Sequence, residues 1–273
     1  MTIAFVQAAN DGGSGASSST RPVTVSAIGT GNFVFGVVTW GSGSSGDLSS
    51  VTDNAAGSPN TYTILMAVTD ATNGQSAAFF YGYNITGGPT VITANFGASL
   101  TYTGISVEEF SGLGTSDPLD GTNYQSQLQA SPGTGTDGAQ SGASTKTPSV
   151  DGCLIAGGSV NTGAVNDVGA SEFDAGTSFT EPTNAEHNVG SDISLCSEYW
   201  IQTTATAANA SFTVAQNTAH YTFMAIFKPD AGGGGGATPT ASGMQNIGEG
   251  FCASAAAGGI PQGLHTIEQG IGA

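Results

Sequence analysis

One short apolar run decides the fold class of this chain, because it is uncharged and dense in β-branched and aromatic residues. It reads Gly31-Asn32-Phe33-Val34-Phe35-Gly36-Val37-Val38. Such residues favour extended backbone, and Gly and Asn in front of them are typical of a turn. The Gly-Ser stretch that begins at residue 41 limits the length of the run on its other side. We therefore predict a buried β-strand over residues 32–40.

Runs of the same kind recur along the chain, separated by clusters of Gly, Asn, Asp and Ser. The expected strands are 3–9, 22–28, 32–40, 61–68, 77–85, 89–96, 101–110, 153–160, 194–203, 210–215 and 219–228. No twelve-residue window before position 240 carries the apolar stripe of a helix. The pattern predicts an all-β fold, and we expect a jelly-roll-like antiparallel β-sandwich over residues 1–230.

The strands of the two halves of this sandwich resemble one another in sequence. The corresponding segments are 31–38 and 151–158, 78–83 and 196–201, 90–93 and 211–214, and 102–110 and 221–227. We interpret this as one sandwich built from two pseudo-repeated halves, about 1–115 and 145–230. Two small sandwiches in tandem would give the same pattern, and so would convergent strand composition. The low-complexity stretch 117–147 is expected to be a surface excursion.

The charge of the chain is strongly one-sided. Arg21, Lys146 and Lys228 are its only Lys and Arg residues, against 20 Asp and Glu, so the formal net charge is −17. A chain with so few cations cannot bind a nucleic acid by releasing counterions, nor an anionic membrane surface. We therefore expect neither nucleic acid nor membrane among its partners.

The two ends of the chain and its cysteines carry further expectations. Residues 1–6 lack the basic and long apolar regions of a secretion signal, so we expect synthesis in a host cytoplasm without a signal peptide. Cys153, Cys196 and Cys252 are far apart in the sequence. A Cys153–Cys196 disulfide is conceivable, and buried free thiols are the alternative that we favour.

The C-terminal region differs from the rest in composition. Residues 231–236 form a polyglycine linker, which behaves as a flexible tether, and 237–273 form a tail with few large apolar residues. The tail cannot build its own core, so it is either disordered or an anchoring arm that orders on a partner. Its candidate partner-binding residues are Ile247, Phe251, Ile260, Leu264, Ile267 and Ile271.

Candidate sites for chemistry are few. Glu108 and Glu109 are neighbours on an expected strand, so their side chains point to opposite faces and cannot flank one glycosidic bond. The loops around Asp53, Asp117–Asp120 and Asp167–Asp174 carry ligands of the kind that Ca²⁺ prefers, although we favour solvated turns as their explanation. No nucleophile elbow precedes a helix. We therefore expect no catalytic residues and no cofactor, with Ca²⁺ the one metal to consider.

Exposed aromatic rings would suit a sugar-binding surface. Trp40 and Trp200 are the candidates for stacking on a glycan, alongside Tyr81, Tyr83 and Tyr199. Phe79, Tyr81 and Tyr83 share one strand face and Phe80 takes the other, while Tyr199 and Trp200 face opposite ways. At least one aromatic set must therefore belong to a core or to a subunit contact.

Several motifs resemble a β-sandwich module of bacteriophage virion proteins and large bacterial surface proteins. The similarity covers residues 3–229 and lies in a Gly-Asn strand opening, a Val-Thr-Asp turn, a strand that runs into Ser-Gly-Leu, and a closing apolar strand. These segments are 31–41, 51–53 with 62–63, 107–113 with 118–120, and 224–229. The resemblance implies a fold and a setting on a virion or cell surface, with no catalytic set.

These observations together favour a non-enzymatic bacteriophage virion structural protein, such as a capsid decoration protein or a fibre or spike subunit. Its partners would be other virion proteins and further copies of itself, as a homotrimer, because assembly covers exposed sheet edges. The alternative is a carbohydrate-binding adhesin or a receptor-binding module that recognises a host surface glycan. An enzyme is the third and least favoured class.

Overall fold

The computed structural model describes residues 2–13, 17–129, 138–139, 145–161, 173–189, 193–214 and 220–230. These residues form antiparallel β-strands, joined by loops and one short 3-10 turn at Ser45–Asp47. The predicted all-β antiparallel sandwich is confirmed. The expected linker 231–236 and arm 237–273 lie outside the described residues.

The first half of the chain forms a five-stranded path with two additional strands. The path has the order β1, β7, β3, β6 and β5, while β2 and β4 both pair with β7. The strands are β1 (Ala4–Gly13), β2 (Ser18–Thr24), β3 (Phe33–Gly41), β4 (Leu48–Asp53), β5 (Tyr62–Asp70), β6 (Gln75–Gly82) and β7 (Val91–Ser111).

Strand β7 connects the two parts of this sheet. Its residues 101–111 pair with β1 and β3, whereas residues 91–100 pair with β2 and β4. We predicted two separate strands, 89–96 and 101–110, but the backbone stays extended through Gly97. An apolar core that includes Trp40, Phe80 and Phe96 fills the space between the two parts.

The second half repeats this arrangement. Its five-stranded sheet has the order β12, β13, β10, β15 and β8, and a small sheet has the order β11, β14 and β9. The strands are β8 (Leu119–Gln129), β9 (Gly138–Ala139), β10 (Leu154–Asn161), β11 (Phe173–Ala175), β12 (His187–Val189), β13 (Ile193–Ile201), β14 (Phe212–Val214) and β15 (His220–Phe227).

The similarity in sequence between the halves matches a similarity in topology. β3 lies between β6 and β7 in the first half, and β10 lies between β13 and β15 in the second. These are the segments whose sequences correspond, which argues against convergent composition alone. β14, between β11 and β9, takes the place of residues 91–96 of β7, between β4 and β2. Each half therefore has its own pair of strand layers.

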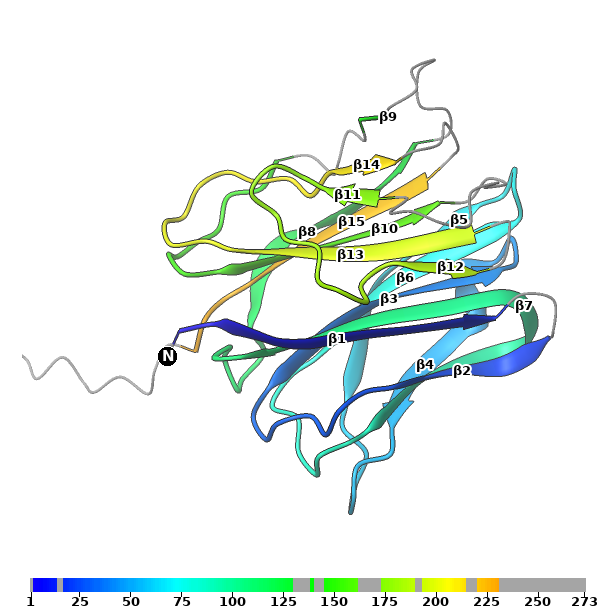
Figure 1. Cartoon of the computed structure of the whole chain (residues 1–273), viewed down its shortest axis with the longest axis horizontal. Helices are drawn as coiled ribbons and strands as arrows, with labels where there is room; N and C mark the ends of the chain where they lie inside the picture. Colours follow the sequence, from blue (N-terminus) through cyan, green and yellow to red (C-terminus); the bar gives the residue numbers. More distant parts are fainter. Residues whose placement is uncertain are drawn as a thin grey trace, which may run out of the picture. The chain divides into compact units, whose positions relative to one another are not determined.

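The largest core lies between the two five-stranded layers, so the halves share it. Figure 1 shows the four layers one above another, from β11 and β14 at the top to β2 and β4 at the bottom. Phe33 packs against Phe227 with ring centroids 4.6 Å apart, and Phe79 against Phe223 at 6.4 Å. Burial of this aromatic surface joins the two halves into one body.

Two local expectations are corrected. The stretch 117–147 was expected to be a surface excursion, yet residues 119–129 form β8, an edge strand that pairs with β15. Its Leu119 and Tyr124 pack on the shared core. These few apolar side chains were enough to hold a mostly polar segment in the sheet. The expected Val51-Thr52-Asp53 turn is the end of strand β4, which pairs with β7.

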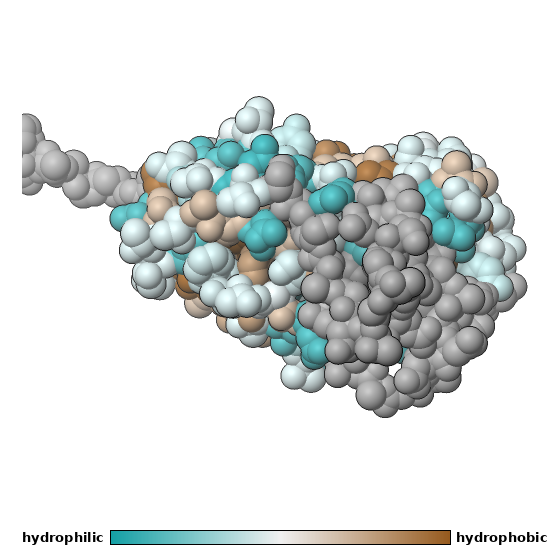
Figure 2. Space-filling model, turned by 90° about the horizontal axis from the view of Figure 1, so that it is seen from above, coloured by the Kyte–Doolittle hydropathy of each residue, from teal (hydrophilic) through white to brown (hydrophobic). Residues whose placement is uncertain are grey.

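The surface of the described residues is hydrophilic for most of its area. Among them, Val6 and Val150 are the exposed large hydrophobic residues, at 48% and 43% exposure. Figure 2 shows one face on which apolar residues are scattered among polar ones. No helix in the described ranges is long and apolar enough to cross a membrane.

Candidate functional site

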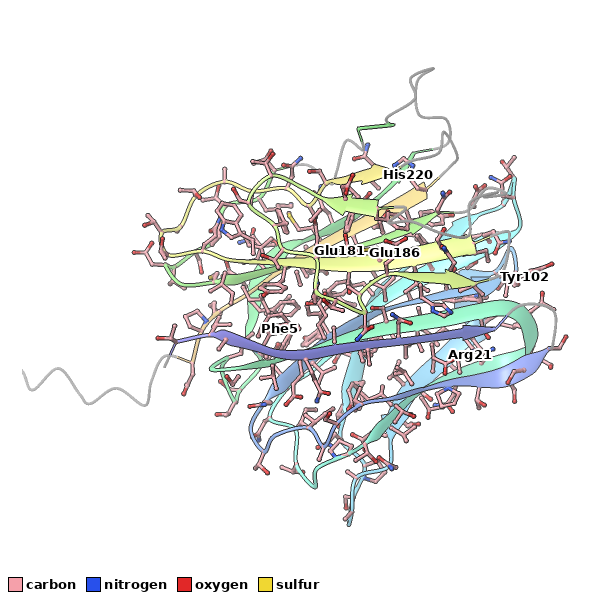
Figure 3. The ribbon with its side chains drawn as sticks, viewed as in Figure 1. Phe5, Arg21, Tyr102, Glu181, Glu186 and His220 are labelled. Atoms are coloured by element: carbon pink, nitrogen blue, oxygen red, sulfur yellow. The ribbon has the colours of Figure 1, made fainter. Side chains whose placement is uncertain are left out.

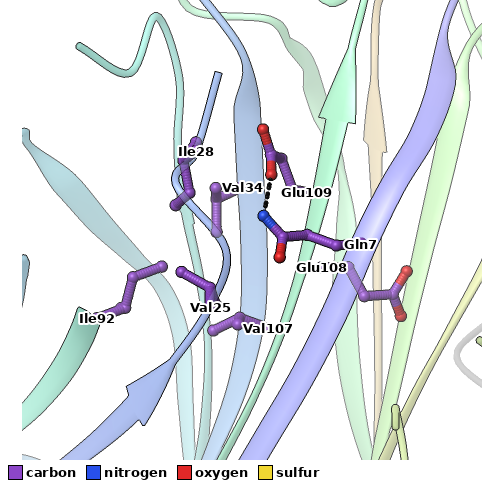
Figure 4. A pocket seen from close by; sticks show the side chains of 8 residues that line it. All are labelled: Gln7, Val25, Ile28, Val34, Ile92, Val107, Glu108 and Glu109. Carbon is purple, nitrogen blue, oxygen red and sulfur yellow. Dashed lines mark hydrogen bonds between the residues drawn. The ribbon is translucent and has the colours of Figure 1, made fainter. Parts of the chain in front are cut away.

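Two neighbouring acids of β7 lie on opposite faces of the first half, as predicted. Glu109 faces the core between the layers of that half, where its carboxylate accepts three hydrogen bonds. The donors are Gln7 Nε2 at 2.5 Å, Asn32 Nδ2 at 2.5 Å and the backbone N–H of Gly29 at 2.8 Å. Figure 4 shows the bond from Gln7. This carboxylate holds β1 and the loop before β3 in place.

Glu108 faces the other way, toward the second half. Its side chain is 1% exposed, and neither carboxyl oxygen has a hydrogen-bond partner. On the same face of β7, Ser106 Oγ lies 3.1 Å from Ser197 Oγ and donates to the carbonyl of Ala185 at 3.0 Å. Because Ser106 has one proton and gives it to Ala185, Ser197 must donate to Ser106. While Ser197 donates to Ser106, it has no proton left for Glu108.

Further acids of the second half surround this position. Glu181 and Glu186 lie on the segment that leads into β12, as Figure 3 shows. Glu198, on β13, is fully buried and accepts hydrogen bonds from the backbone N–H groups of Gly176 at 2.8 Å and Ser211 at 3.1 Å. We call Glu108, Glu181, Glu186 and Glu198 the acid cluster.

Three acids of this cluster have a raised pKa. Burial raises the pKa of Glu108 to about 8; the neighbouring Ser197 hydroxyl opposes this rise, and the nearby Glu181 carboxyl adds to it. Burial, and then repulsion from Glu186, raises the pKa of Glu181 to about 7. Burial also raises the pKa of Glu198 well above its ordinary value. Carboxyls removed from water without a nearby cation favour their neutral form.

Three of these four acids were not candidates for a site on the basis of the sequence. Glu198 could have been noticed in the sequence, because it is a charged residue within an expected strand, between Cys196 and Trp200. Glu181 and Glu186 carried none, since they lie in a polar stretch. Glu108 was noted for its orientation, but the sequence does not show that it meets a second layer.

The two cysteines within the described residues are free and buried, as favoured above. Cys153 packs with Ile155 and Met224, and Cys196 with Phe173, Ala185 and Phe212, in separate clusters. Burial raises the pKa of both thiols, so neither is an activated nucleophile.

Two of the three candidate calcium loops use their carboxylates internally. Asp53 accepts hydrogen bonds from the backbone of Ala55 and the side chains of Asn60 and Tyr62, and Asp120 from Ser149. Residues 162–172 of the third loop lie outside the described residues. In the part of the chain that the structure describes, no three His, Cys, Asp or Glu side chains are grouped to hold a metal.

The tryptophans lie in different surroundings. Trp40 is completely buried, packs against Phe96 and donates from Nε1 to the carbonyl of Ser44, so its ring has no face for a sugar. The expectation for Trp40 is therefore wrong. Trp200 is half-buried and meets Phe179 edge to face, at 5.9 Å between ring centroids.

The remaining candidate residues lie in the tail. The six apolar residues expected to bind a partner all fall between 247 and 271, outside the described residues. Of the smaller aromatic candidates, Tyr81 and Tyr83 pack on the shared core, as does Tyr199. The predicted division of faces is confirmed, because Phe80 lies in the core of the first half and Trp200 in that of the second.

Two spaces in the described residues differ in their capacity for a ligand. The gap beside Glu109, lined by Gln7, Val25 and Ile92 among others, does not admit a water molecule (Figure 4). An open hollow of about 350 Å³ lies at one end of the layers. It is lined by Thr2, Ile3, Asp151, Gly152, Ile201, Gln202, Thr203 and Pro229.

Comparison with known proteins adds no family assignment. No protein-family model matches the sequence, and no curated protein has significant similarity to it. The class of protein that the structure defines is an antiparallel β-sandwich of two related halves.

Proposed function

We propose that this chain is a non-enzymatic bacteriophage virion structural protein that displays its sandwich on the particle. The observation that carries the proposal is the shared aromatic core, which makes one body of two related halves. Such a body resists local opening, because separating the halves would expose rings such as Phe33, Phe79 and Phe227. Resistance of this kind suits a capsid decoration protein or a fibre or spike subunit.

The surface supports the same role. Large apolar side chains are scattered on the described surface, and the charge of the whole chain is −17. Arg21 forms an ion pair with Asp11 at 3.2 Å, and Lys146 and Lys228 are the only other Lys or Arg residues against 20 Asp and Glu. Copies that are not docked would repel one another, and the particle would not collect nucleic acid.

Attachment is assigned in this proposal to the tail, residues 237–273, after the polyglycine linker. The described residues belong to one compact unit, which extends to Gly232. The partners are other virion proteins and further copies of the chain, as a homotrimer. Sheet edges such as β5 and β8 would be covered by assembly.

The test is localisation followed by truncation. Antibodies against the full chain should label purified particles from the source culture in immunogold electron microscopy. Full-length protein should bind particles that lack it, while a chain ending at residue 230 should keep its far-ultraviolet circular dichroism and fail to bind. Absence of label from all particles would refute the virion role, and binding by the truncated chain would refute the anchor.

A carbohydrate-binding adhesin is the second candidate, and Trp200 is the observation that favours it. Its ring is partly accessible and is oriented by Phe179. An aromatic face that is already fixed can stack on a sugar with little loss of conformational freedom. Binding to a glycan array that Trp200→Ala abolishes would support this function, and absence of binding to all glycans would remove it.

A further inference from the structure

The contact between the two halves contains a buried carboxyl group without a donor. Glu108 belongs to β7 of the first half, and Ser197 of β13 and the segment 180–186 of the second half lie opposite it. Both of its oxygens are inaccessible to water and have no hydrogen-bond partner. A charged carboxylate in this position would lose its hydration without gaining any donor.

The Ser197 hydroxyl favours the charge of Glu108 in part, while the acidic groups near it oppose that charge. Glu181 is the charged group that acts on it, and it acts by repulsion. Tyr199, Cys196 and Glu198 from β13 also lie within electrostatic reach, and each of them is neutral or acidic. Among the groups found to act on Glu108 there is no cation.

We propose that the contact between the halves is a proton-dependent latch, which is closed while Glu108 is protonated and loosens when Glu108 ionises. The segment 181–186 is the part that moves, because Ala185 bonds to Ser106 and Glu181 repels the ionised group. The latch does not depend on the proposed virion role, since it follows from the described residues alone.

The direction and size of the effect follow from linkage. The pKa of Glu108 is about 8 when the contact is closed and returns toward 4.5 when the group reaches water. The open form therefore binds fewer protons, and its population rises with pH, by about tenfold per unit between these two values. Full exposure of Glu108 on opening would raise the opening constant roughly several hundredfold between pH 5 and pH 8.

The buried thiols provide a readout. Cys196 packs against Ala185 of the moving segment, while Cys153 lies in a separate cluster with Ile155 and Met224. The full-length protein is labelled with iodoacetamide between pH 5 and pH 9, and peptide mass spectrometry follows each cysteine. Iodoacetamide reacts with the thiolate, so labelling also rises with pH because the thiol ionises. The ratio of wild-type to variant labelling at the same pH removes this contribution.

The variant Glu108→Gln removes the ionisable group, and Glu109→Gln is the matched control on the opposite face of β7. We expect the ratio of wild-type to E108Q labelling at Cys196 to rise at least tenfold from pH 5 to pH 8. Cys153 should be labelled far more slowly than Cys196 at pH 8, because it becomes accessible when the whole body unfolds. E109Q disturbs the hydrogen bonds from Gln7, Asn32 and Gly29 and should be less stable, but its labelling at Cys196 should rise with pH as in the wild type. Glu108→Met replaces E108Q if the latter does not fold, because it also removes the charge.

Two outcomes would overturn the latch. An unchanged ratio at Cys196 would show that ionisation of Glu108 does not open the contact. Equal labelling of Cys196 and Cys153 at pH 8 would show that both thiols become accessible only when the whole body unfolds, without a separate opening of the contact. The comparison of Cys196 with Cys153 within the wild-type protein decides the question even without a variant.

Discussion

The contact between the central strands of the two halves can be tested by adding one methyl group. Gly158 lies on β10, and a Cβ atom built on it would stand 2.3 Å from Cγ2 of Val37 on β3. Real carbon atoms do not approach so closely, so Gly158→Ala must push the two layers apart or force Val37 out of its rotamer. Both strands are central in their sheets, which limits the relief available.

The magnitude follows from two opposing effects. Overpacking a well-packed core costs about 1–3 kcal/mol. Replacing Gly by Ala also restricts the unfolded chain, which returns roughly 0.4–1 kcal/mol. We therefore expect G158A to lower the free energy of unfolding by about 1–2 kcal/mol. Gly97→Ala is the matched control, because a Cβ there meets nothing closer than 3.9 Å, and it should change stability little.

A double-mutant cycle isolates the contact. Val37→Ala removes both γ-methyl groups and should cost about 2 kcal/mol alone, from lost burial and the cavity that remains. In the double variant the new methyl group occupies part of that cavity, so the two costs should fall short of additivity by about 1 kcal/mol or more. Urea unfolding followed by circular dichroism gives the free energy of unfolding of all four proteins. The comparison requires that the slope of this free energy against urea concentration be the same in each.

Any of three results would contradict the predicted contact. If G158A is as stable as the wild type, the layers are not in contact at this position. If V37A and G158A are additive, the clash lies elsewhere. A loss in G97A as large as that in G158A would show that Gly is required for the strand itself and not for the contact between halves.

Three further predictions concern the cores. The free energy of unfolding should fall by about 5 kcal/mol as pH rises from about 4.5 to 8, because of the raised pKa of Glu108. The unfolded chain releases this proton at lower pH than the folded chain does. A urea midpoint that increases over this range would contradict the prediction. Trp40→Ala should cost about 3–5 kcal/mol, since the ring is fully buried, and a loss below about 1 kcal/mol by urea unfolding would show that the ring is not in a core. Cys153 should stay unreactive toward a disulfide reagent at neutral pH until urea is added, and rapid reaction in the native protein would place it at the surface.

Much of the local structure could be predicted from the sequence because a strand is a local pattern. The run 32–40 became β3, and the division of faces along 79–83 was confirmed. Alternation of side chains is a property of extended backbone, and it does not depend on what the strand packs against. For the same reason the opposite orientations of Glu108 and Glu109 were predictable.

Strand limits were less predictable where the signal was weak or broken. Residues 119–129 are polar, and pairing with β15 made them a strand, with Leu119 and Tyr124 on the shared core. Gly97 suggested a break, but neighbours on both sides hold β7 extended through it. In both cases the partner strand decided, and its position depends on residues distant in the sequence.

The amino-acid order alone determined the fold class, the strand faces and the excess of negative charge. Only the tertiary structure decided that each half forms its own layers, that the layers meet across an aromatic core, and that Trp40 and Glu108 are buried. The physical reason is that a strand has two faces, and alternation shows that both can be apolar without showing which layer covers each. Burial and proton affinity depend on that second layer, so they appear only when the halves are brought together.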